Sequence, residues 1–361
     1  KVIGYQRIAE LAHDMQYHNA SEYFWEIVTR QRSLALGGNS RREHFPTKET
    51  CIDYVNDIDG PETCNTYNML KLTEDLNRVN HQGMYGDFYE TAIFNHILSA
   101  QHPEHGGYVY FTSARPRHYR NYSAPNKAMW CCVGTGMEDH GKYGQFIWTH
   151  DKGMKTEDDA LYVNLFVASE LNWKERKMVL RQQTAFPYAE TSNIEVTKGK
   201  GVFTLKIRKP LWCDNFTVKG VGFVVDCYEE NGFVCIKRKW KKGDQVEISM
   251  PMHASIKPMI NVPQYVAIMY GPILLGMKSG TEDMRSLIAD DSRFGQYAAG
   301  MKLPLDKAPI LLPKHLNDIA KDLKPIPDKP LHFKLATHME NVINGELQPF
   351  FEIHDSRYMM Y

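Results

Sequence analysis

The sequence predicts an α+β multidomain protein in which helices come first and antiparallel β-sandwich domains follow. Three observations support this fold class. The chain has 361 residues, more than one typical domain. Up to about residue 147 the apolar residues recur at helical spacing, and from residue 161 they alternate with polar residues in short, turn-bounded segments. We expect a helical domain over 1–153, a β-sandwich over 154–262 and a second β-sandwich or β-rich domain over 263–361.

The helical pattern is clearest in "NTYNMLKLTEDLNRVN", residues 65–80. Its apolar residues follow the spacing i, i+3, i+7 and i+10, which predicts one buried stripe with charges on the opposite face. The stripe consists of Met69, Leu72, Leu76 and Val79. Gly-rich loops join such segments and are longer than most connections in helix bundles, and loops of this kind commonly carry functional residues.

The β pattern appears in segments such as "GVFTLKIRKPLW" (residues 201–212) and "NGFVCIKRKW" (231–240). β-Branched and aromatic residues alternate there with polar ones, as in strands that bury one face. Several such segments within about 100 residues fit a β-sandwich. A further strand pair begins at "VPQYVAIMYGPILLG" (262–276), and the prolines between residues 301 and 331 predict a loop-rich excursion.

Charge and hydropathy bear on the partners. Lys and Arg total 43 and Asp and Glu total 43, so no net field attracts nucleic acid or an anionic membrane. The longest nearly apolar stretch, residues 265–277, contains Gly271 and Pro272 and is too short to cross a bilayer. We therefore expect no nucleic-acid partner and no membrane span, while the oligomeric state cannot be read from the sequence. No secretory leader is visible, and Lys1 lacks a cap before an apparent helix, so we expect the chain to begin inside a larger gene product.

Seven cysteines are spread along the chain. A chain of this size does not need a disulfide framework, and neighbours such as Cys131 and Cys132 rarely bridge each other because the ring is strained. Thiol chemistry or metal ligation is favoured for that pair. Three further cysteines lie among strand-like apolar residues and are expected to be small buried side chains. They are Cys213, Cys227 and Cys235.

Four residues form a candidate metal site. Glu62 and Cys64 lie two apart at the entry to a predicted helix, and Cys131 and Cys132 lie on a distant Gly-flanked loop. Together they offer one carboxylate and three sulfurs, and Zn²⁺ normally takes four ligands of these kinds or imidazole. The spacing alone favours unrelated buried thiols over a zinc site, because no CxxC pair is present, and a Cys51–Cys64 disulfide in an exported protein is a further alternative.

The long motifs of the chain resemble a known family. They are "SLALGGNSRREHFP", "DIDGPETCNTYNMLKLTEDL", "YETAIFNHILSAQ", "GGYVYFTSARP", "WCCVGTGMEDHGKYGQFIW" and "HDSRYMMY". They resemble the β-L-arabinofuranosidases of glycoside hydrolase families 127 and 146, most closely the latter. The resemblance implies an (α/α)6 helical barrel followed by β-sandwich domains. Residues 1–153 would be the C-terminal portion of that barrel, since they are too few for all of it.

The resemblance also implies roles for individual residues. It implies that Zn²⁺ is bound by Glu62, Cys64, Cys131 and Cys132, that Cys131 is the nucleophile, and that Glu43 in "RREHF" is the acid/base. Glu90 in "YETAIFN" and Tyr110 in "YVYF" are similar to residues that contact the sugar. The expected activity is the retaining release of β-L-arabinofuranose from an arabinose-containing oligo- or polysaccharide of plants. A periplasmic or cell-surface location is implied as well, and this chain is expected to be an incomplete part of the enzyme.

This residue set makes chemical sense for a retaining glycosidase. Such enzymes ordinarily use two carboxyl groups, one as nucleophile and one as acid and then base. Here a thiolate would replace the nucleophile. A free thiol with a pKa near about 8.5 is mostly protonated at neutral pH, whereas coordination to zinc removes the proton and holds the sulfur in place. Glu43 would serve both half-reactions.

Simpler interpretations exist for residues taken alone. Glu43 would be a solvated loop carboxylate and Glu90 an ordinary charge on a helix face. The basic run "ARPRHYR" (114–120) is interpreted as a solvated loop or the rim of a sugar cleft rather than a phosphate site. We interpret three histidines as supporting or surface residues, because the four-ligand set is complete without them. They are His44, His140 and His150. Three aromatic residues could equally stack on a sugar or lie in the core. They are Tyr67, Tyr122 and Trp130.

Two other functions stay open from the sequence. One is a noncatalytic carbohydrate-binding or structural protein in which zinc only joins two loops. The other is a lyase or epimerase built on a helical toroid, which would need Glu43 and a tyrosine but no cysteine.

Overall fold

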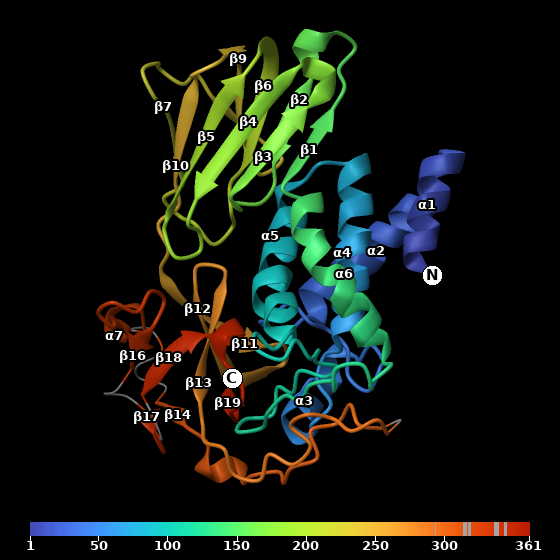
Figure 1. Ribbon diagram of the computed structural model, residues 1–361, viewed down its shortest axis with the longest axis vertical. Coiled ribbons are helices and arrows are strands. Elements are labelled where there is room, and N and C mark those ends of the chain that lie inside the picture. The colour runs from blue at the N-terminus through green and yellow to red at the C-terminus, as the bar shows by residue number, and fades with distance from the viewer. Residues whose placement is uncertain (293, 313–315, 317–318, 336–338, 343–344) are drawn as a thin grey trace. The chain divides into compact units, whose positions relative to one another are not determined.

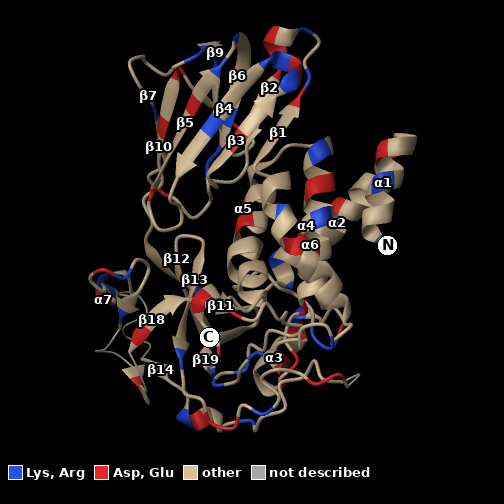
Figure 2. Ribbon diagram, in the orientation of Figure 1, with Lys and Arg blue, Asp and Glu red and all other residues tan. Residues whose placement is uncertain are grey.

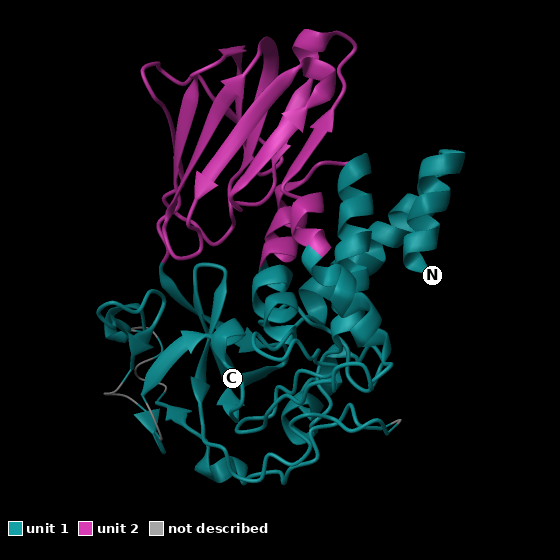
Figure 3. Cartoon of the chain, viewed as in Figure 1, with its two compact units in different colours: residues 1–79, 91–140, 253–361 teal, residues 80–90, 141–252 magenta. Residues whose placement is uncertain are grey.

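The computed structural model describes the chain except residues 293, 313–315, 317–318, 336–338 and 343–344. The described chain divides into two compact units, coloured separately in Figure 3. Unit 1 comprises residues 1–79, 91–140 and 253–361, and unit 2 comprises residues 80–90 and 141–252. The two units combine separate stretches of the chain, whereas the predicted domains are continuous. The predicted domain boundaries at 153 and 262 therefore stay a prediction.

The helices lie mainly in the first part of the chain (Figure 1). They are α1 (Val2–Ala12), α2 (Met15–Gln31), α3 (Asp53–Asn56), α4 (Thr63–Val79), α5 (Gly83–Ala92), α6 (Cys131–Gln145) and the short α7 (Ile319–Asp322). In α4 the predicted stripe is buried at Met69, Leu72 and Leu76. Val79 is 44% exposed, so its predicted burial is wrong. It is the last residue of the helix, where the neighbouring turn that would cover it is missing.

Unit 2 contains two five-stranded sheets (Figure 1). In spatial order, one consists of β1 (Trp148–Asp151), β2 (Ala160–Val163), β6 (Lys200–Arg208), β9 (Phe233–Lys241) and β8 (Tyr228–Glu230). The other consists of β3 (Ser169–Trp173), β4 (Met178–Thr184), β5 (Thr191–Lys198), β10 (Gln245–Ser249) and β7 (Thr217–Gly220). Neighbouring strands are antiparallel, except that β2 runs parallel to β6.

The two sheets of unit 2 share an aromatic core. The ring of Trp173 on β3 lies 5.4 Å from that of Phe203 on β6, and Phe203 lies 5.7 Å from Trp240 on β9. All three side chains are buried, so the inner faces of the sheets pack as in a sandwich. Cys235 is buried on β9 as predicted, whereas Cys227 is exposed. The prediction for Cys227 is wrong because it precedes β8, the solvent-exposed edge strand.

Unit 1 contains the remaining strands. Its larger sheet has the order β11 (Ala254–Met259), β12 (Val262–Tyr270), β13 (Ile273–Lys278), β18 (Glu346–Pro349), β16 (Phe333–Lys334) and β15 (Lys324–Pro325), and β19 (Tyr358–Met359) pairs with β13. The described pair β14 (Ile310–Leu311) and β17 (Met339–Glu340) stands apart from it.

This sheet shares a core with the loops of the helical region. Leu36, Tyr54 and Cys51 pack in one buried cluster with residues of the sheet region such as Leu274 and Phe350. Cys51 is 0% exposed and free, and so is not bridged to Cys64. A disulfide between them is therefore wrong, and Cys51 serves as a small core side chain. The helical loops and the last sheet thus fold around common apolar residues.

Acidic and basic residues are interspersed along the helices and strands of both units (Figure 2). Among the described helices, none is both long and apolar enough to cross a membrane.

A buried ion-pair network lies inside unit 2. Arg208 on β6 is 0% exposed and donates to Asp87 and to Glu90 on α5, with both N–O distances 2.6 Å. The remaining carboxylate oxygen of Glu90 accepts from the Trp212 indole at 2.8 Å. A third Arg208 donor reaches the Asn164 carbonyl at 2.6 Å. Because every charge here has a partner, the network holds α5 residues to the sandwich, and removing one member would strand a buried charge.

We predict that Arg208→Met lowers the free energy of unfolding by about 3–5 kcal/mol, because Glu90 would stay buried without a cation. Denaturant unfolding monitored by circular dichroism measures the change. The control is Arg181→Met, which removes an exposed ion pair with Glu170 and should change stability by less than about 1 kcal/mol. Equal, small effects of the two substitutions would contradict a structural role for the network.

Candidate functional site

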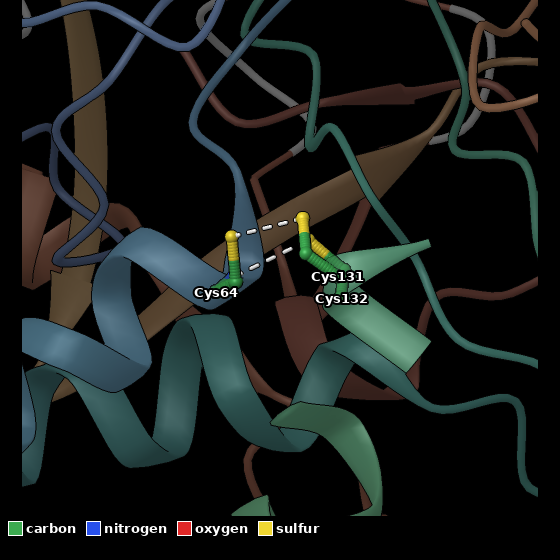
Figure 4. A group of neighbouring side chains, drawn as sticks. All are labelled: Cys64, Cys131 and Cys132. Atoms are coloured by element: carbon green, nitrogen blue, oxygen red, sulfur yellow. Dashed lines mark hydrogen bonds between the residues drawn. The ribbon is translucent and has the colours of Figure 1, made fainter. Parts of the chain in front are cut away.

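Three cysteine sulfurs converge in unit 1 (Figure 4). The Sγ of Cys64 lies 3.4 Å from that of Cys131, which lies 4.0 Å from that of Cys132. The Sγ of Cys132 in turn accepts from the Cys64 backbone N–H at 3.4 Å. All three sulfurs lie within 4.8 Å of one another, a spacing that fits ligands of a single metal ion.

Helix N-termini place these sulfurs. Cys64 is the second residue of α4, and Cys131 and Cys132 are the first two residues of α6. The free N–H groups and the partial positive charge of a helix start favour thiolate over thiol. Hydrogen bonds from Cys132 and Cys64 lower the pKa of the Cys131 thiol. The pKa of Cys64 is raised because it donates to Cys131, and burial raises that of Cys132. The negative charge therefore settles on Cys131, the exposed member of the group.

Glu62 lies beside the three sulfurs. Its Oε1 lies 3.2 Å from the Cys64 Sγ, while its buried Oε2 has no hydrogen-bond partner among the described residues. Burial raises the pKa of Glu62 to about 7. A buried oxygen without a partner is unfavourable unless a cation or water satisfies it. The three sulfurs thus fit the ligands of one metal ion, and Glu62 offers an unpaired carboxylate oxygen next to them.

A short backbone pairing brings Glu62 beside Tyr110. Glu62 and Phe111 form an antiparallel bridge, and the Thr63 N–H donates to the Tyr110 carbonyl at 3.1 Å. The approach requires a glycine just before it: a Cβ on Gly60 would lie 1.8 Å from the Thr112 carbonyl oxygen. Gly60 therefore allows the loop before α4 to pack against the strand-like segment that carries Tyr110.

Glu43 lies on a strained turn. Arg41 and His44 exchange backbone hydrogen bonds of 2.9 and 3.0 Å, and the two residues between them have positive φ, 50° for Arg42 and 62° for Glu43. This is the pattern of a type I′ turn, which normally takes Asn or Gly. Left-handed backbone at two larger residues points to a functional constraint. The Tyr110 hydroxyl, which donates a hydrogen bond to the Glu43 carboxylate, also contacts the Cys131 sulfur.

The loop that carries Glu43 is fixed to the start of α4. Ser40 Oγ accepts from the Glu62 N–H at 3.0 Å, and Asn39 Oδ1 accepts from the Asn65 side chain at 2.5 Å. Both Asn39 and Ser40 are buried. Hydrogen bonds of this kind, made by buried side chains, fix the position of one segment on another, so Glu43 and the cysteines belong to one framework.

Cys131 opens into a cavity of about 730 Å³, large enough for a small sugar chain. Its lining combines carboxylate, guanidinium, amide and aromatic groups. The lining residues are Arg42, Glu43, Asp59, Tyr110, Trp130, Cys131, Phe294, Gln296 and Tyr297. The structure thus brings together Glu43, Tyr110 and Cys131 at the cavity, with the other predicted metal ligands next to Cys131.

Glu90 is placed differently. It belongs to unit 2, is 1% exposed, and gives its two carboxylate oxygens to Arg208 and Trp212. A contact with sugar therefore stays a prediction. The three histidines contact other groups: His44 the Arg42 carbonyl, His140 the Gln101 side chain and His150 the Trp173 ring.

The segment "ARPRHYR" is largely buried, so its interpretation as a solvated loop is wrong, and a place at the rim of a sugar cleft stays a prediction. Arg115 and Arg120 are 8% and 2% exposed and donate to backbone carbonyls, including those of Val55 and Ser99. Arginine can be buried when its five donors find acceptors, and a basic run gives no signal of this in the sequence. Of the aromatic residues considered, Trp130 lines the cavity, while Tyr67 and Tyr122 are buried.

Sequence reasoning missed five lining residues. They are Arg42, Asp59, Phe294, Gln296 and Tyr297. The left-handed turn that exposes Arg42 has no Asn-Gly signature. The last three follow no periodic pattern and lie far along the chain from the cysteines, so only the fold brings them to the cavity.

Known families match three stretches of the chain. "Beta-L-arabinofuranosidase, GH127 catalytic domain" matches residues 1–145, and "Beta-L-arabinofuranosidase, GH127 middle domain" matches residues 160–252. A domain of unknown function matches residues 255–361. No curated protein matches the chain.

Solved structures share the fold. A GH127 β-arabinofuranosidase matches with TM-score 0.72 and 18% identity, and a GH127 β-L-arabinofuranosidase from Geobacillus stearothermophilus T6 with 0.69 and 19%. A protein described as a glycoside hydrolase matches with 0.71 and 18%. Each match covers 99% of this chain, which spans 58%, 58% and 64% of the respective proteins. The predicted architecture of helices followed by β-sheets is confirmed. The predicted closeness to family 146 stays a prediction.

We predict that the protein binds about one metal ion per chain through the cysteine group. Cobalt(II) bound there should show thiolate-to-metal charge-transfer absorption. Loss of a hydrogen bond that supports a ligand weakens metal binding about 10- to 100-fold. Cys132→Ser should weaken binding by more than this, because it removes a ligand itself.

The matched control for this titration is Cys235→Ser, which changes a buried free cysteine of unit 2. Its absorption should equal that of the parent protein. Parental cobalt affinity together with parental charge-transfer intensity in Cys132→Ser would place the ion elsewhere.

Proposed function

Because this chain belongs to glycoside hydrolase family 127, we propose that the protein is a retaining β-L-arabinofuranosidase that releases β-L-arabinofuranose from arabinose-containing plant glycans. The observation that carries the proposal is the position of Cys131. Its sulfur is exposed to the cavity that Glu43 also lines, while two further sulfurs and Glu62 stand next to it. A nucleophile and an acid/base on one sugar-sized cavity are what a retaining glycosidase needs.

The donor set favours Zn²⁺, held by Glu62, Cys64, Cys131 and Cys132. When bound, zinc would keep the sulfurs deprotonated at neutral pH and fix their positions. Groups of the protein also favour the thiolate form of Cys131. They are the N-terminus of α6 and two hydrogen-bond donors.

Two displacements at the anomeric carbon would complete the reaction. In the first, the Cys131 sulfur forms a bond to that carbon, the bond to the leaving oxygen breaks, and Glu43 gives its proton to this oxygen. In the second, Glu43 takes a proton from water, whose oxygen attacks the same carbon and displaces the sulfur. Two inversions restore the original configuration.

Tyr110 would position the acid/base. Its hydroxyl contacts both the Glu43 carboxylate and the Cys131 sulfur, and its side chain is 6% exposed. The hydroxyl therefore holds the carboxylate at a defined distance from the nucleophile. In the same place it can meet a sugar hydroxyl, the role that the resemblance gives it.

We predict that Cys131→Ala abolishes release of L-arabinose from an aryl β-L-arabinofuranoside by the full-length protein, with a loss of about 10⁴-fold or more. The reason is that Cys131 carries the only thiol among the described residues that line the cavity. Circular dichroism and metal content measured on both proteins separate loss of chemistry from loss of folding.

The same comparison tests the noncatalytic alternative. A protein in which zinc only joins two loops would show no turnover in the metal-loaded parent, and Cys131→Ala would reduce its stability alone. If a folded Cys131→Ala variant keeps the parental turnover, Cys131 is not the nucleophile. The lyase or epimerase alternative would then stay open.

We predict that Glu43→Gln lowers turnover of substrates with a sugar leaving group by about 10²- to 10⁴-fold. Glycosides with a dinitrophenyl leaving group need no protonation, so the first half-reaction of the variant should be nearly as fast with them as in the parent. Burst kinetics measure that step.

Glu49→Gln is the matched control for Glu43→Gln, because Glu49 is an exposed carboxylate of the same loop region that does not line the cavity. Its rates should equal the parental ones. An equal loss in the rate of the first half-reaction for both kinds of leaving group would contradict the acid role.

A further inference from the structure

Part of the cavity wall comes from the region that matches a domain of unknown function. Phe294, Gln296 and Tyr297 line the same cavity as Glu43 and Cys131, although they lie in the last third of the chain. All of these residues belong to unit 1. The site therefore includes a wall that the catalytic-domain match, residues 1–145, does not contain.

Buried side chains hold this wall in place. Asn121, 1% exposed, donates through its side chain to the Gly295 carbonyl at 2.6 Å and to the Tyr297 carbonyl at 3.3 Å. The ring Nε2 of His118, 0% exposed, lies 3.1 Å from the Ala298 carbonyl. Both anchors come from the loop between α5 and α6, so the wall is tied to the catalytic part of the chain.

Backbone contacts fix the flanks of the wall to the same loop. On one side, Ala289 N–H donates to the Tyr122 carbonyl at 2.7 Å, and Tyr122 N–H donates to the Leu287 carbonyl at 2.8 Å. On the other, Gly300 N–H donates to the Tyr119 hydroxyl at 2.7 Å. An element anchored on both sides through buried groups presents its side chains in fixed positions, as a specificity-determining wall must.

The chemistry of the wall fits a sugar. Phe294 lines the cavity and is 69% exposed. Tyr297 packs against Phe111 with ring centroids 5.3 Å apart, so its ring has a defined plane. Aromatic faces cover the C–H face of a sugar ring, and planar amide, guanidinium and carboxylate groups pair with its hydroxyls. Gln296, Arg42 and Asp59 supply such groups in the same cavity.

The position of Arg42 indicates which sugar. Arg42 neighbours Glu43 on the strained turn and pairs with Asp59 at 3.0 Å. Under the proposed function, on which this step rests, Glu43 protonates the leaving oxygen, so groups next to Glu43 face the leaving group. We propose that Phe294, Gln296 and Tyr297, together with the Arg42–Asp59 pair, form the subsite that binds the leaving-group sugar, and that this is a task of the domain of unknown function.

The proposal predicts selective loss in Phe294→Ala of the full-length protein. The kcat/KM for 1,2- and 1,3-linked β-L-arabinofuranosyl-L-arabinose should fall about 3- to 10-fold more than that for methyl β-L-arabinofuranoside, because only the disaccharides place a ring against the wall. Phe294→Tyr keeps the ring and should restore most of the loss. Tyr23→Ala removes another exposed aromatic of unit 1, 67% exposed on α2, and should leave the ratio at the parental value.

A binding measurement separates this proposal from the proposed function. Calorimetric titration of the two disaccharides into Cys131→Ala protein, with and without Phe294→Ala, needs no turnover. Weaker disaccharide binding in the double variant supports the subsite, whether or not the parent protein hydrolyses them. If the parent hydrolyses neither disaccharide, only the proposed activity is rejected. Equal binding in the two variants, no binding to either, or an equal kinetic loss for methyl glycoside and disaccharides overturns the subsite.

Discussion

The close placement of four acidic groups is the constraint on which the candidate site depends. Three sulfurs and the Glu62 carboxylate lie together, and all but Cys131 are buried or partly buried. Without a cation they cannot all ionise: the pKa is lowered at Cys131 and raised at Cys64, Cys132 and Glu62. A bound cation would favour the ionised form of all four groups and would connect the starts of α4 and α6. Metal binding would then stabilise the folded state.

Backbone strain at Glu43 is the second feature that this site requires. Left-handed conformations at Arg42 and Glu43 cost about 1–3 kcal/mol each. Ion pairs tie the start of this turn to a later segment: Arg41 pairs with Asp57 at 2.6 Å and with Asp53 at 2.9 Å. The turn thus directs a carboxylate toward Tyr110 and Cys131 while a charged, anchored loop holds it there.

Patterns with a fixed period could be predicted from the sequence, and contacts between distant segments could not. The α4 stripe and the alternation in β6 and β9 follow from the geometry of one element, so they were readable except at an end such as Val79. The resemblance supplied Glu43 and the cysteine group. It did not show that Glu90 is engaged by Arg208, nor that Phe294 reaches the cavity, because these depend on tertiary packing. The buried arginines of 114–120 were misread for the same reason: charge normally means exposure, unless backbone carbonyls elsewhere in the fold accept its donors.

The central claim is that the Cys131 sulfur attacks the anomeric carbon. Its most direct test is to treat the full-length, metal-loaded protein with a thiol-directed analogue of β-L-arabinofuranose and to map the modified peptide by mass spectrometry. The account predicts one sugar adduct on Cys131, with Cys132 unmodified because it is buried, and loss of activity in step with labelling. Labelling of Glu43 alone, or inactivation with Cys131 unmodified, would contradict it.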